Sequence, residues 1–508
     1  MLINFKKLLT NRYFRILIFL LTLYSTFVLR AHNYEKEPTV NHLDELNYSL
    51  SGINLIETGI PVSWSNFDYP KRALIFSGKI DYNGGEPSAS VDLYRPWLDH
   101  PPLFSLIVGW SAHINGVDRN GFIPSSYSRI PTVLMAAVTS IMIFLIARLI
   151  SGYWTGILSM IVYGTVPLFV FASRSAMAEN FIALLFTIIF YLLLKFLDNP
   201  RTWYIYPIPI LVGVAGLSKA TGFFLLPFAM FVIFVTYYLQ KNIKSALYSN
   251  IYLILGTLPF IAAFFAYGYL YDPEIFNKIL AIQSNRPIGF GSLAWFFITP
   301  SYSTALFKDS WFVFCLLTSA YFIFTTKFGL KNIKELIDKN SLVILAFVYS
   351  VMVVMISGGE NDLLAWYRFP SYPFLAIIGS WGLQIIVRKA DFFASFLAVG
   401  MLLGNRMLLS NAFRDNVHPS DYRNILGLLL MPSILRPFFQ SKVLDRVCKI
   451  FIIIVITIGI YINVIYIYNS FEILCESKSC PFGPSTKLST IHFPFFWRFM
   501  VLGTPDRY

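Results

Sequence analysis

The stretch that decides the fold begins with Asp44-Glu45-Leu46-Asn47-Tyr48 and ends with Leu98-Asp99-His100-Pro101-Pro102. It is a polar segment that carries carboxylates, an imidazole and aromatic rings, and it lies between apolar runs on both sides. Polar groups next to hydrocarbon are costly, so their presence there favours a function. We therefore interpret residues 44–102 as a loop between membrane spans and expect any chemistry to begin in it.

The composition places the whole chain in a membrane. Of its 508 residues 56% are hydrophobic and only 13% are charged, and the mean hydropathy is +0.61. A water-soluble globule could not bury so much apolar surface, so we predict an all-α polytopic membrane protein whose partner is the lipid bilayer. The formal charge of +13 arises mostly from short loops between apolar runs. This is the positive-inside pattern and not a nucleic-acid-binding face.

The N-terminus sets the orientation. Residues 1–15 contain four basic residues and no acidic residue, and an apolar run over 16–29 follows. The pattern resembles a signal peptide, but no small-residue cleavage site follows at Arg30-Ala31-His32, so we interpret it as an uncleaved first span. The basic flank then lies inside, and residues 44–102 belong to a large first outer loop, 32–128.

The remaining apolar runs complete a count of about thirteen transmembrane helices. The run over 205–239 is too long for one crossing, because as a single helix it would extend roughly 52 Å at 1.5 Å per residue. It must turn at its polar break, Ser218-Lys219-Ala220-Thr221-Gly222. The run over 103–114 is too short to cross and reads as an interfacial or re-entrant helix that begins at Pro101-Pro102. The predicted spans are 16–29, 130–150, 156–172, 181–197, two within 205–239, 251–270, 311–325, 342–356, 369–387, 392–403, 425–439 and 450–468.

This topology brings ionisable residues together on the outer side, which predicts a shared outer cavity. They are Asp44, Glu45, Asp99, His100, Arg129, Arg174, Glu179, Lys219 and Arg368.

A structural role competes with a functional one at each position. Asp44 suits a helix N-cap, and Glu45 suits the first turn of a helix that ends at Thr58-Gly59, whereas the functional reading makes Asp44 a general base. His100 suits a cap of the helix that follows it. Arg174 and Glu179 suit an ion pair with each other.

Two cations are harder to assign to structure alone. Lys219 breaks an apolar run where serine or glycine would turn the chain without a charge, and snorkelling is its structural alternative. Arg368 stands where a span begins outside, against the usual charge bias. An anionic head group would explain it, and a snorkelling side chain is the alternative.

Several of these segments resemble one family in their order and spacing. Residues 44–48 with 52–59 look like the start of the first outer loop in GT-C glycosyltransferases, of the protein O-mannosyltransferase and lipid A aminoarabinose transferase type. Asp99-His100-Pro101-Pro102 resembles the exit of that loop. The resemblance covers roughly residues 10–390 and continues at Ser128-Arg129-Ile130-Pro131, Gly216-Leu217-Ser218-Lys219-Ala220-Thr221-Gly222 and Tyr367-Arg368-Phe369-Pro370.

The resemblance implies a GT-C fold, a polyprenyl-phosphate sugar as donor substrate, and transfer with inversion on the extracytoplasmic face. It matches Asp44 to the catalytic or acceptor-activating acid and Glu179 to a second outer acid. It matches Asp99 and His100 to an acid and a basic residue at the loop exit, and Lys219 to a lysine near the donor phosphate. We predict catalytic roles for Asp44, Glu45 and Glu179. We also predict that the donor phosphate binds Lys219, Arg368, His100 and Arg129, and that Tyr48, Asp99 and Arg174 contact the acceptor or sugar.

Two positions depart from the aminoarabinose transferases. Asn47 stands where these enzymes carry an arginine, and His100 where they carry a lysine. The sugar and the acceptor therefore stay open. The acceptor would be a hydroxyl or phosphate of a lipid, glycan or protein.

Other functions and features stay open as well. A transporter or flippase for lipid-linked sugars would also show many spans, although the ionisable residues gather at span ends and no internal repeat is visible. A non-catalytic assembly subunit is a third option. No cofactor is assigned; a divalent metal would suit Asp44, Glu45, Asp99 and Glu179, but no compact ligand spacing is present.

We divide the chain into a catalytic module over 1–390, further spans over 391–468, and a short extracytoplasmic tail over 469–508. Cys475 and Cys480 in that tail would form a small disulfide loop in an oxidising compartment, and two free thiols are the alternative. The expected location is a multi-pass position in the plasma (inner) membrane.

Overall fold

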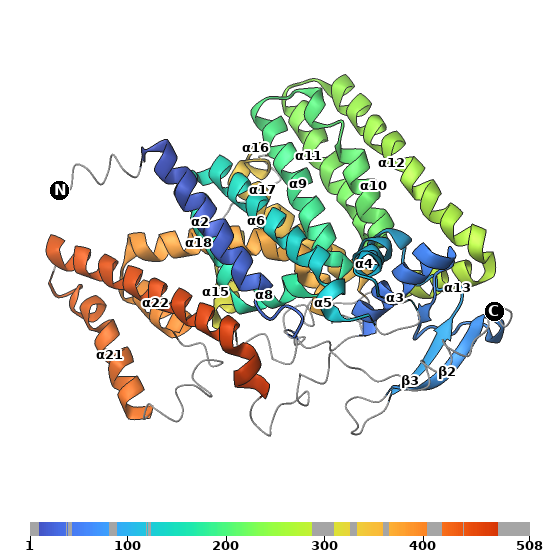
Figure 1. The fold of residues 1–508 in the computed structure, drawn as a ribbon. Coiled ribbons are helices and arrows are strands. Elements are labelled where there is room, and N and C mark those ends of the chain that lie inside the picture. Colours follow the sequence, from blue (N-terminus) through green and yellow to red (C-terminus); the bar gives the residue numbers. More distant parts are fainter. Residues whose placement is uncertain are drawn as a thin grey trace.

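The computed structural model describes residues 10–36, 38, 43–80, 89–117, 119, 123–286, 309–325, 333–358, 365–403, 419–439 and 441–475. Almost all of them are helical, as the composition predicts (Figure 1). The long helices pack side by side, while α3, α4, α13 and a small sheet cover one end of the bundle. We call this the site end, and the opposite end the far end.

Eight helices within the described residues are long and apolar enough to cross a membrane, and a bent pair raises the number to nine. The expected fold class is confirmed, but the count of about thirteen is not, because shorter apolar helices account for several predicted spans. The eight are α2 (Arg12–Ala31), α5 with α6 (Ser125–Ser151), α9 (Ala178–Asp198), η3 with α11 (Ala220–Leu239), α12 (Ile243–Tyr271), α17 (Lys339–Ser357), η5 with α18 (Trp366–Lys389) and α22 (Lys442–Asn469).

The expected continuous span over 156–172 is wrong. The chain forms α7 (Tyr153–Thr165) and α8 (Pro167–Arg174), which are bent by 69° relative to each other. Pro167 occupies the first turn of α8, where a proline needs no N–H partner, and its ring restricts the preceding residue to an extended conformation. The hydropathy of the run is uniform, so it does not reveal this break.

The turn predicted within 205–239 is present. Helix α10 (Ile208–Ser218) ends immediately before Lys219, whose backbone is extended, and η3 (Ala220–Phe224) leads into α11 (Leu225–Leu239). The turn lies at the site end, so Lys219 is held where the apolar run reverses.

Among the described residues of the first outer loop, helices α3 and α4 accompany a three-stranded antiparallel sheet. Helices α3 (Leu43–Thr58) and α4 (Pro102–Ile114) match the predicted juxtamembrane helices, and α4 begins at the predicted proline. The sheet was not predicted; its order is β1 (Ser63–Trp64), β3 (Ala89–Tyr94), β2 (Leu74–Ile80).

An apolar cluster joins this sheet to α13 (Pro273–Ser284). Tyr94 and Leu98 of the loop share the cluster with Ile275 and Phe276 of α13. This contact fixes the loop against the site end of α12.

The remaining described helices complete the bundle. The large core lies between α6 (Ile130–Ser151), α9, α11, α15 (Ser310–Thr325), α17 and α18 (Tyr372–Lys389). Shorter elements are α5 (Ser125–Ser128), η1 (Lys71–Ala73), η2 (Thr202–Tyr204), α16 (Ile333–Leu336), η5 (Ala365–Ser371), α19 (Phe392–Leu397), η6 (Ala398–Leu403) and α21 (Pro419–Leu435), and α22 extends over Lys442–Cys475.

Helices α3 and α4 touch through glycines. A Cβ atom on Gly52 would lie 1.8 Å from the Ser105 carbonyl oxygen, and one on Gly109 would lie 2.3 Å from the Gly52 carbonyl carbon. The two backbones are therefore in contact, and no side chain larger than a hydrogen atom fits between them. This crossing fixes the position of the residues that α3 and the start of α4 carry.

We predict that Gly52→Ala separates α3 from α4 and lowers the free energy of unfolding by about 1–3 kcal/mol, the usual cost of overpacking. Gly427→Ala in α21 is the matched control, because nothing lies within 4 Å of its Cβ position. Thermal unfolding of both purified variants measures the effect. Equal melting temperatures for the two variants would contradict the close crossing.

Candidate active site

The candidate site contains a buried ion pair between Lys219 and Glu179. Lys219 caps the C-terminus of α10, Glu179 lies in the first turn of α9, and the Lys219 Nζ to Glu179 Oε1 distance is 2.5 Å. The two side chains are 6% and 3% exposed. The ammonium group also lies 4.4 Å from the centre of the Tyr367 ring. A charge buried beside hydrocarbon requires a partner, and each of these residues supplies one to the other.

The second carboxylate oxygen of Glu179 takes no part in this ion pair. The Glu179 Oε2 atom is buried and has no hydrogen-bond partner among the described residues. A buried acceptor without a partner costs free energy, so it points to a ligand or to water.

Tyr48 lies over the same region. Its ring stacks on His100 with centroids 5.1 Å apart and meets Phe104 edge-on at 5.0 Å. The Tyr48 hydroxyl is buried and finds no hydrogen-bond partner in the described part of the chain. Burial, followed by the charges of Glu179 and Asp44, raises its pKa well above the usual value, so the hydroxyl stays protonated and able to donate.

Two titratable groups at the loop exit, Asp99 and His100, have pKa values that burial shifts in opposite directions. Burial raises the pKa of Asp99 to about 7, although the Tyr69 hydroxyl donates to Asp99 Oδ1 at 2.8 Å. Burial, followed by the charge of Lys219, lowers the pKa of His100 to about 3. His100 is therefore neutral at pH 7 and can act on an anion only through an N–H group. It also does not cap α4, because the residue at the N-cap is Pro101.

Asp44 faces this cluster from α3. It is half-buried in the first turn of the helix, and its charge acts on Tyr48, Asp99, His100 and Lys219. The structure thus brings together six of the predicted residues around one region: Asp44, Tyr48, Asp99, His100, Glu179 and Lys219.

Glu45 and Arg129 lie beside this cluster but bind each other. Arg129 donates through Nε to Glu45 Oε2 at 2.8 Å and through Nη2 to Glu45 Oε1 at 2.9 Å, and both side chains are buried. The Ala176 N–H also donates to Glu45 Oε2, and Arg129 Nη1 binds the carbonyls of Tyr34 and Pro38. Because the polar atoms of both side chains are occupied by these hydrogen bonds, the contacts favour a structural role for the pair. The catalytic role of Glu45 and the phosphate-binding role of Arg129 stay predictions.

Arg174 does not pair with Glu179 as expected. Its guanidinium donates to the carbonyls of Leu29 and Arg30 at the end of α2, whereas Glu179 pairs with Lys219. The contacts favour a role in holding α2 against α8, and the predicted sugar contact stays a prediction.

Arg368 is fully buried in η5, next to Tyr367. Sequence reasoning did not assign Tyr367 or Arg286 to the site. Arg286 Nη1 lies 3.2 Å from the Tyr367 hydroxyl, and the charge of Arg286 acts on His100. Both had weak signals in the sequence. Tyr367 directly precedes Arg368, and Arg286 is a cation between the predicted spans 251–270 and 311–325.

The structure does not support a metal site among the described residues and does not test the predicted disulfide. Within the described residues no group of three or more His, Cys, Asp or Glu side chains could hold a metal ion. Cys480 and the side chain of Cys475 lie outside what the structure describes.

The comparisons with known proteins give one partial match to a family. Residues 99–267 match the family model described as dolichyl-phosphate-mannose-protein mannosyltransferase. The matched third of the chain contains Asp99, His100, Glu179 and Lys219. No curated protein sequence is similar enough to be matched to the chain.

Solved structures decide the fold. The arabinosyltransferase EmbB from Mycobacterium smegmatis superposes with a TM-score of 0.53 over 88% of this chain and 40% of its own, at 11% identity. The chain therefore shares the fold of this arabinosyltransferase.

Two further solved structures are similar at lower scores. The archaeal oligosaccharyltransferase AglB from Archaeoglobus fulgidus has a TM-score of 0.49 at 11% identity, over 95% of this chain and 60% of its own. ArnT from Cupriavidus metallidurans, bound to undecaprenyl phosphate, has a TM-score of 0.47 at 16% identity, over 97% and 88% of the two chains. The chain described here thus spans less than two thirds of AglB and of EmbB.

We predict that Glu45→Gln destabilises the protein by about 3–5 kcal/mol, because it leaves the buried Arg129 cation without its carboxylate. Asp44→Asn is the matched control, since it removes the same charge one residue earlier at a half-buried position. Thermal unfolding in detergent measures both variants. A melting temperature for Glu45→Gln as high as that of Asp44→Asn would contradict the structural role of the pair.

A second prediction concerns pH. The pKa of Asp99 is about 7 in the folded protein and 3.8 in an unperturbed carboxyl group, so folding binds a proton between these values. The contribution of Asp99 to stability is therefore present below pH 4 and is lost as the pH rises to 7, by at most about 1.4 kcal/mol per pH unit.

The measurement is the difference in melting temperature between the wild-type protein and Asp99→Asn as a function of pH. We expect this difference to fall between pH 4 and pH 7 and to be constant at higher pH. The opposite slope from His100 is present in both proteins and cancels. A flat difference across the whole range would show that Asp99 is not protonated in the folded state.

Proposed function

We propose that this GT-C protein transfers a sugar from a polyprenyl-phosphate-linked donor to an acceptor hydroxyl or phosphate, with inversion at the anomeric carbon. The observation that carries the proposal is the buried Lys219–Glu179 pair, which lies beside Asp44 and under Tyr367. The family model over residues 99–267 supports a donor of the lipid-phosphate-sugar class.

The cations define one side of the proposed site. Lys219 and Arg286 both act on His100, and Arg368 follows Tyr367 in the chain. Fixed cations stabilise the charge that develops on a leaving phosphate. We therefore place the donor phosphate among these three cations, with His100 as a neutral N–H donor to it.

The acidic residue on α3 defines the other side. The acceptor oxygen attacks the anomeric carbon from the face opposite the phosphate, the bond between that carbon and the phosphate oxygen breaks, and its electron pair leaves with the polyprenyl phosphate. Asp44 takes the proton of a hydroxyl acceptor. Glu179 keeps Lys219 charged and in place, and its second oxygen and the Tyr48 hydroxyl are left to bind the sugar or acceptor.

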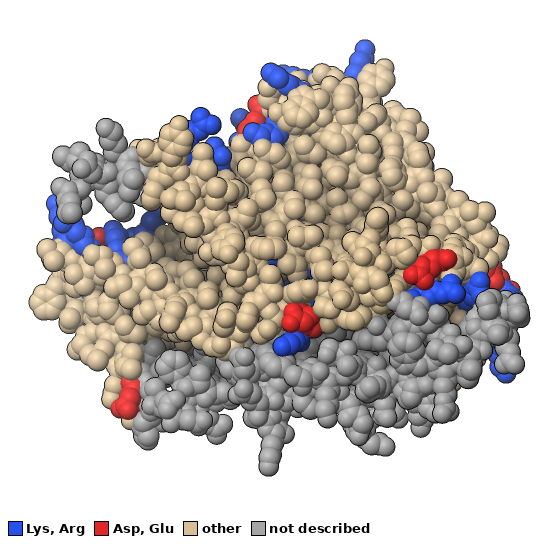
Figure 2. All heavy atoms as spheres, viewed as in Figure 1, with Lys and Arg blue, Asp and Glu red and all other residues tan. Residues whose placement is uncertain are grey.

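The charge distribution supports an extracytoplasmic site. Lys and Arg gather along the far end, around the connections between the long helices (Figure 2). By the positive-inside rule the far end faces the cytoplasm, and the site end then faces the opposite side of the membrane. The location we propose is the plasma (inner) membrane.

Asp44→Asn and Lys219→Gln should fail in different ways. Without its base, Asp44→Asn should lose roughly 10²–10⁴-fold in turnover while it binds the lipid phosphate as the wild type does. Lys219→Gln should bind the lipid phosphate more weakly, because it removes a cation from the phosphate side. The measurements are sugar transfer from polyprenyl-phosphate donors and titration of a polyprenyl phosphate, both with purified protein in detergent.

Near-normal turnover of Asp44→Asn would refute the base, and unchanged lipid-phosphate binding by Lys219→Gln would refute the phosphate site. Transfer in detergent also separates an enzyme from a flippase, since a flippase acts only across a sealed bilayer. Mass spectrometry of envelope lipids, glycans and proteins with and without the gene would identify the acceptor.

A further inference from the structure

A basic pocket lies at the far end, between α21 and α22. Its volume is about 520 Å³, and it is lined by Arg436, Ser441, Lys442, Asp445, Arg446 and Lys449. Figure 2 shows Lys and Arg side chains gathered at the left of the molecule. Four cations against one carboxylate leave the lining with a formal charge of +3.

Two of the four cations in this pocket are not neutralised by Asp445. Asp445 is already bound by Arg436 and Lys449, each at 2.7 Å. Lys442 and Arg446 are exposed and form no ion pair with the described residues. The pocket is therefore organised by one carboxylate and presents two further cations to a ligand, as a site for an anion requires.

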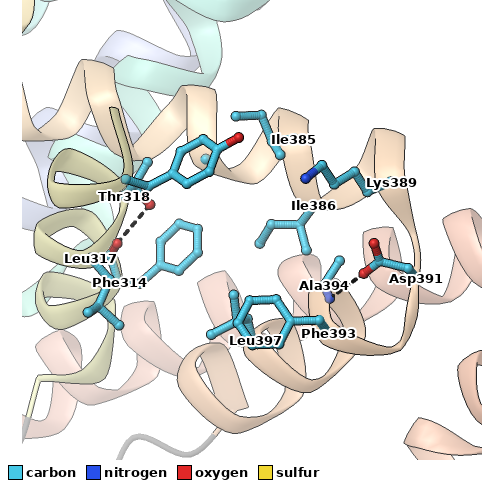
Figure 3. A pocket seen from close by; sticks show the side chains of 12 residues that line it. Phe314, Leu317, Thr318, Ile385, Ile386, Lys389, Asp391, Phe393, Ala394 and Leu397 are labelled. Atoms are coloured by element: carbon cyan, nitrogen blue, oxygen red, sulfur yellow. Dashed lines mark hydrogen bonds between the residues drawn. The ribbon is translucent and has the colours of Figure 1, made fainter. Parts of the chain in front are cut away.

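A second pocket, about 330 Å³ in volume, lies between α15, α18 and α19. Figure 3 shows Phe314, Leu317, Ile386 and Leu397 around its interior, while Lys389 and Asp391 lie together at one rim. Its lining is mostly apolar, so the pocket suits a hydrocarbon chain.

The two pockets are neighbours. Arg436, which lines the basic pocket, donates through Nη1 to the carbonyl of Lys389, which lines the apolar one, at 2.5 Å. Phe438 and Phe439 follow directly and are 78% and 62% exposed. Exposed aromatic rings beside cations are typical of the membrane interface.

We propose that the two pockets together form a binding site for an anionic phospholipid. Its phosphate headgroup binds Lys442 and Arg446, and an acyl chain enters the pocket between α15, α18 and α19. A basic pocket between membrane helices that adjoins an apolar groove matches both halves of such a lipid. A free phosphate would leave the apolar pocket unused, and a neutral lipid would leave the cations unpaired.

This site is distinct from the proposed transfer site. Tyr372 and Lys389 are the two ends of α18, and its 18 residues extend about 27 Å at 1.5 Å per residue. The start of α18 follows Tyr367 and Arg368, while its end carries Lys389 at the apolar pocket. The lipid would thus bind in the opposite leaflet from the donor phosphate.

The test uses delipidated full-length protein in a neutral detergent, titrated with phosphatidylglycerol or phosphatidylcholine and observed by native mass spectrometry. We expect phosphatidylglycerol to bind more tightly. Lys442→Gln combined with Arg446→Gln should weaken its binding about 30-fold, since each cation near a membrane surface contributes roughly fivefold.

The matched control is Lys241→Gln combined with Lys244→Gln, which removes the same charge from exposed positions elsewhere at the far end. It should bind phosphatidylglycerol as the wild type does. Equal weakening in the two double variants would show a general attraction of charge and overturn the site.

Two further measurements test the lipid itself. Ile385→Trp fills the apolar pocket and should weaken phosphatidylglycerol binding, while a monodisperse elution profile verifies its fold. Glycerol 3-phosphate, which lacks the acyl chains, should bind far more weakly than the lipid. Equal affinity for glycerol 3-phosphate, or for phosphatidylcholine, would overturn the proposal.

Discussion

A charge or a backbone polar group beside hydrocarbon has to find its partner inside the protein, because no water is present to provide one. The broken span of α7 and α8 satisfies this requirement through side chains from other helices. Arg30 of α2 donates to the Tyr163 carbonyl near the end of α7. Asp309 accepts from the Leu168 N–H at the start of α8 and from the Phe312 N–H at the start of α15. One buried carboxylate thus holds the N-termini of two helices together.

The same requirement separates two adjacent carboxylates. Glu45 is enclosed by Arg129 and by the backbone of the connection between α8 and α9, so its charge is neutralised within the fold. Asp44, one residue earlier, is turned toward Lys219 and the loop exit, where its charge acts on groups of other elements. Successive residues on a helix lie about 100° apart, so one side chain can support the fold while its neighbour faces a ligand.

The sequence predicts the helices well because membrane spans are defined by length and composition. The turn at Lys219, the start of α4 and the end of α3 at Thr58 were all predictable from residues that interrupt or cap an apolar run. The break at Pro167 was not, because the residues on both sides are apolar and the cause is the ring of one proline, which holds the preceding residue extended. The small sheet was missed because short strands in a polar loop lack a clear apolar alternation.

The candidate site was predictable as a set of residues, but its pairings were not. Arg174 and Glu179 are close in the chain and looked like a pair, yet Glu179 binds Lys219 from another helix. Proximity in sequence identifies a partner only when both residues share one surface of one element. Tyr367 and Arg286 enter the site through the tertiary arrangement of η5 and the end of α13, which the order of residues along the chain does not reveal.

Helix α18 connects the two ends of the molecule, and its packing limits how they can influence each other. A Cβ atom on Gly379 would lie 2.5 Å from Cys315 Sγ, and one on Gly382 would lie 2.5 Å from Thr318 Oγ1. The helix therefore lies directly against α15 at these two glycines. Closely packed interiors do not deform continuously, so a lipid at the far end would act mainly by holding α15, α18 and α19 together. The position of Tyr367 and Arg368 at the site end would then gain rigidity from the lipid and not undergo a shift.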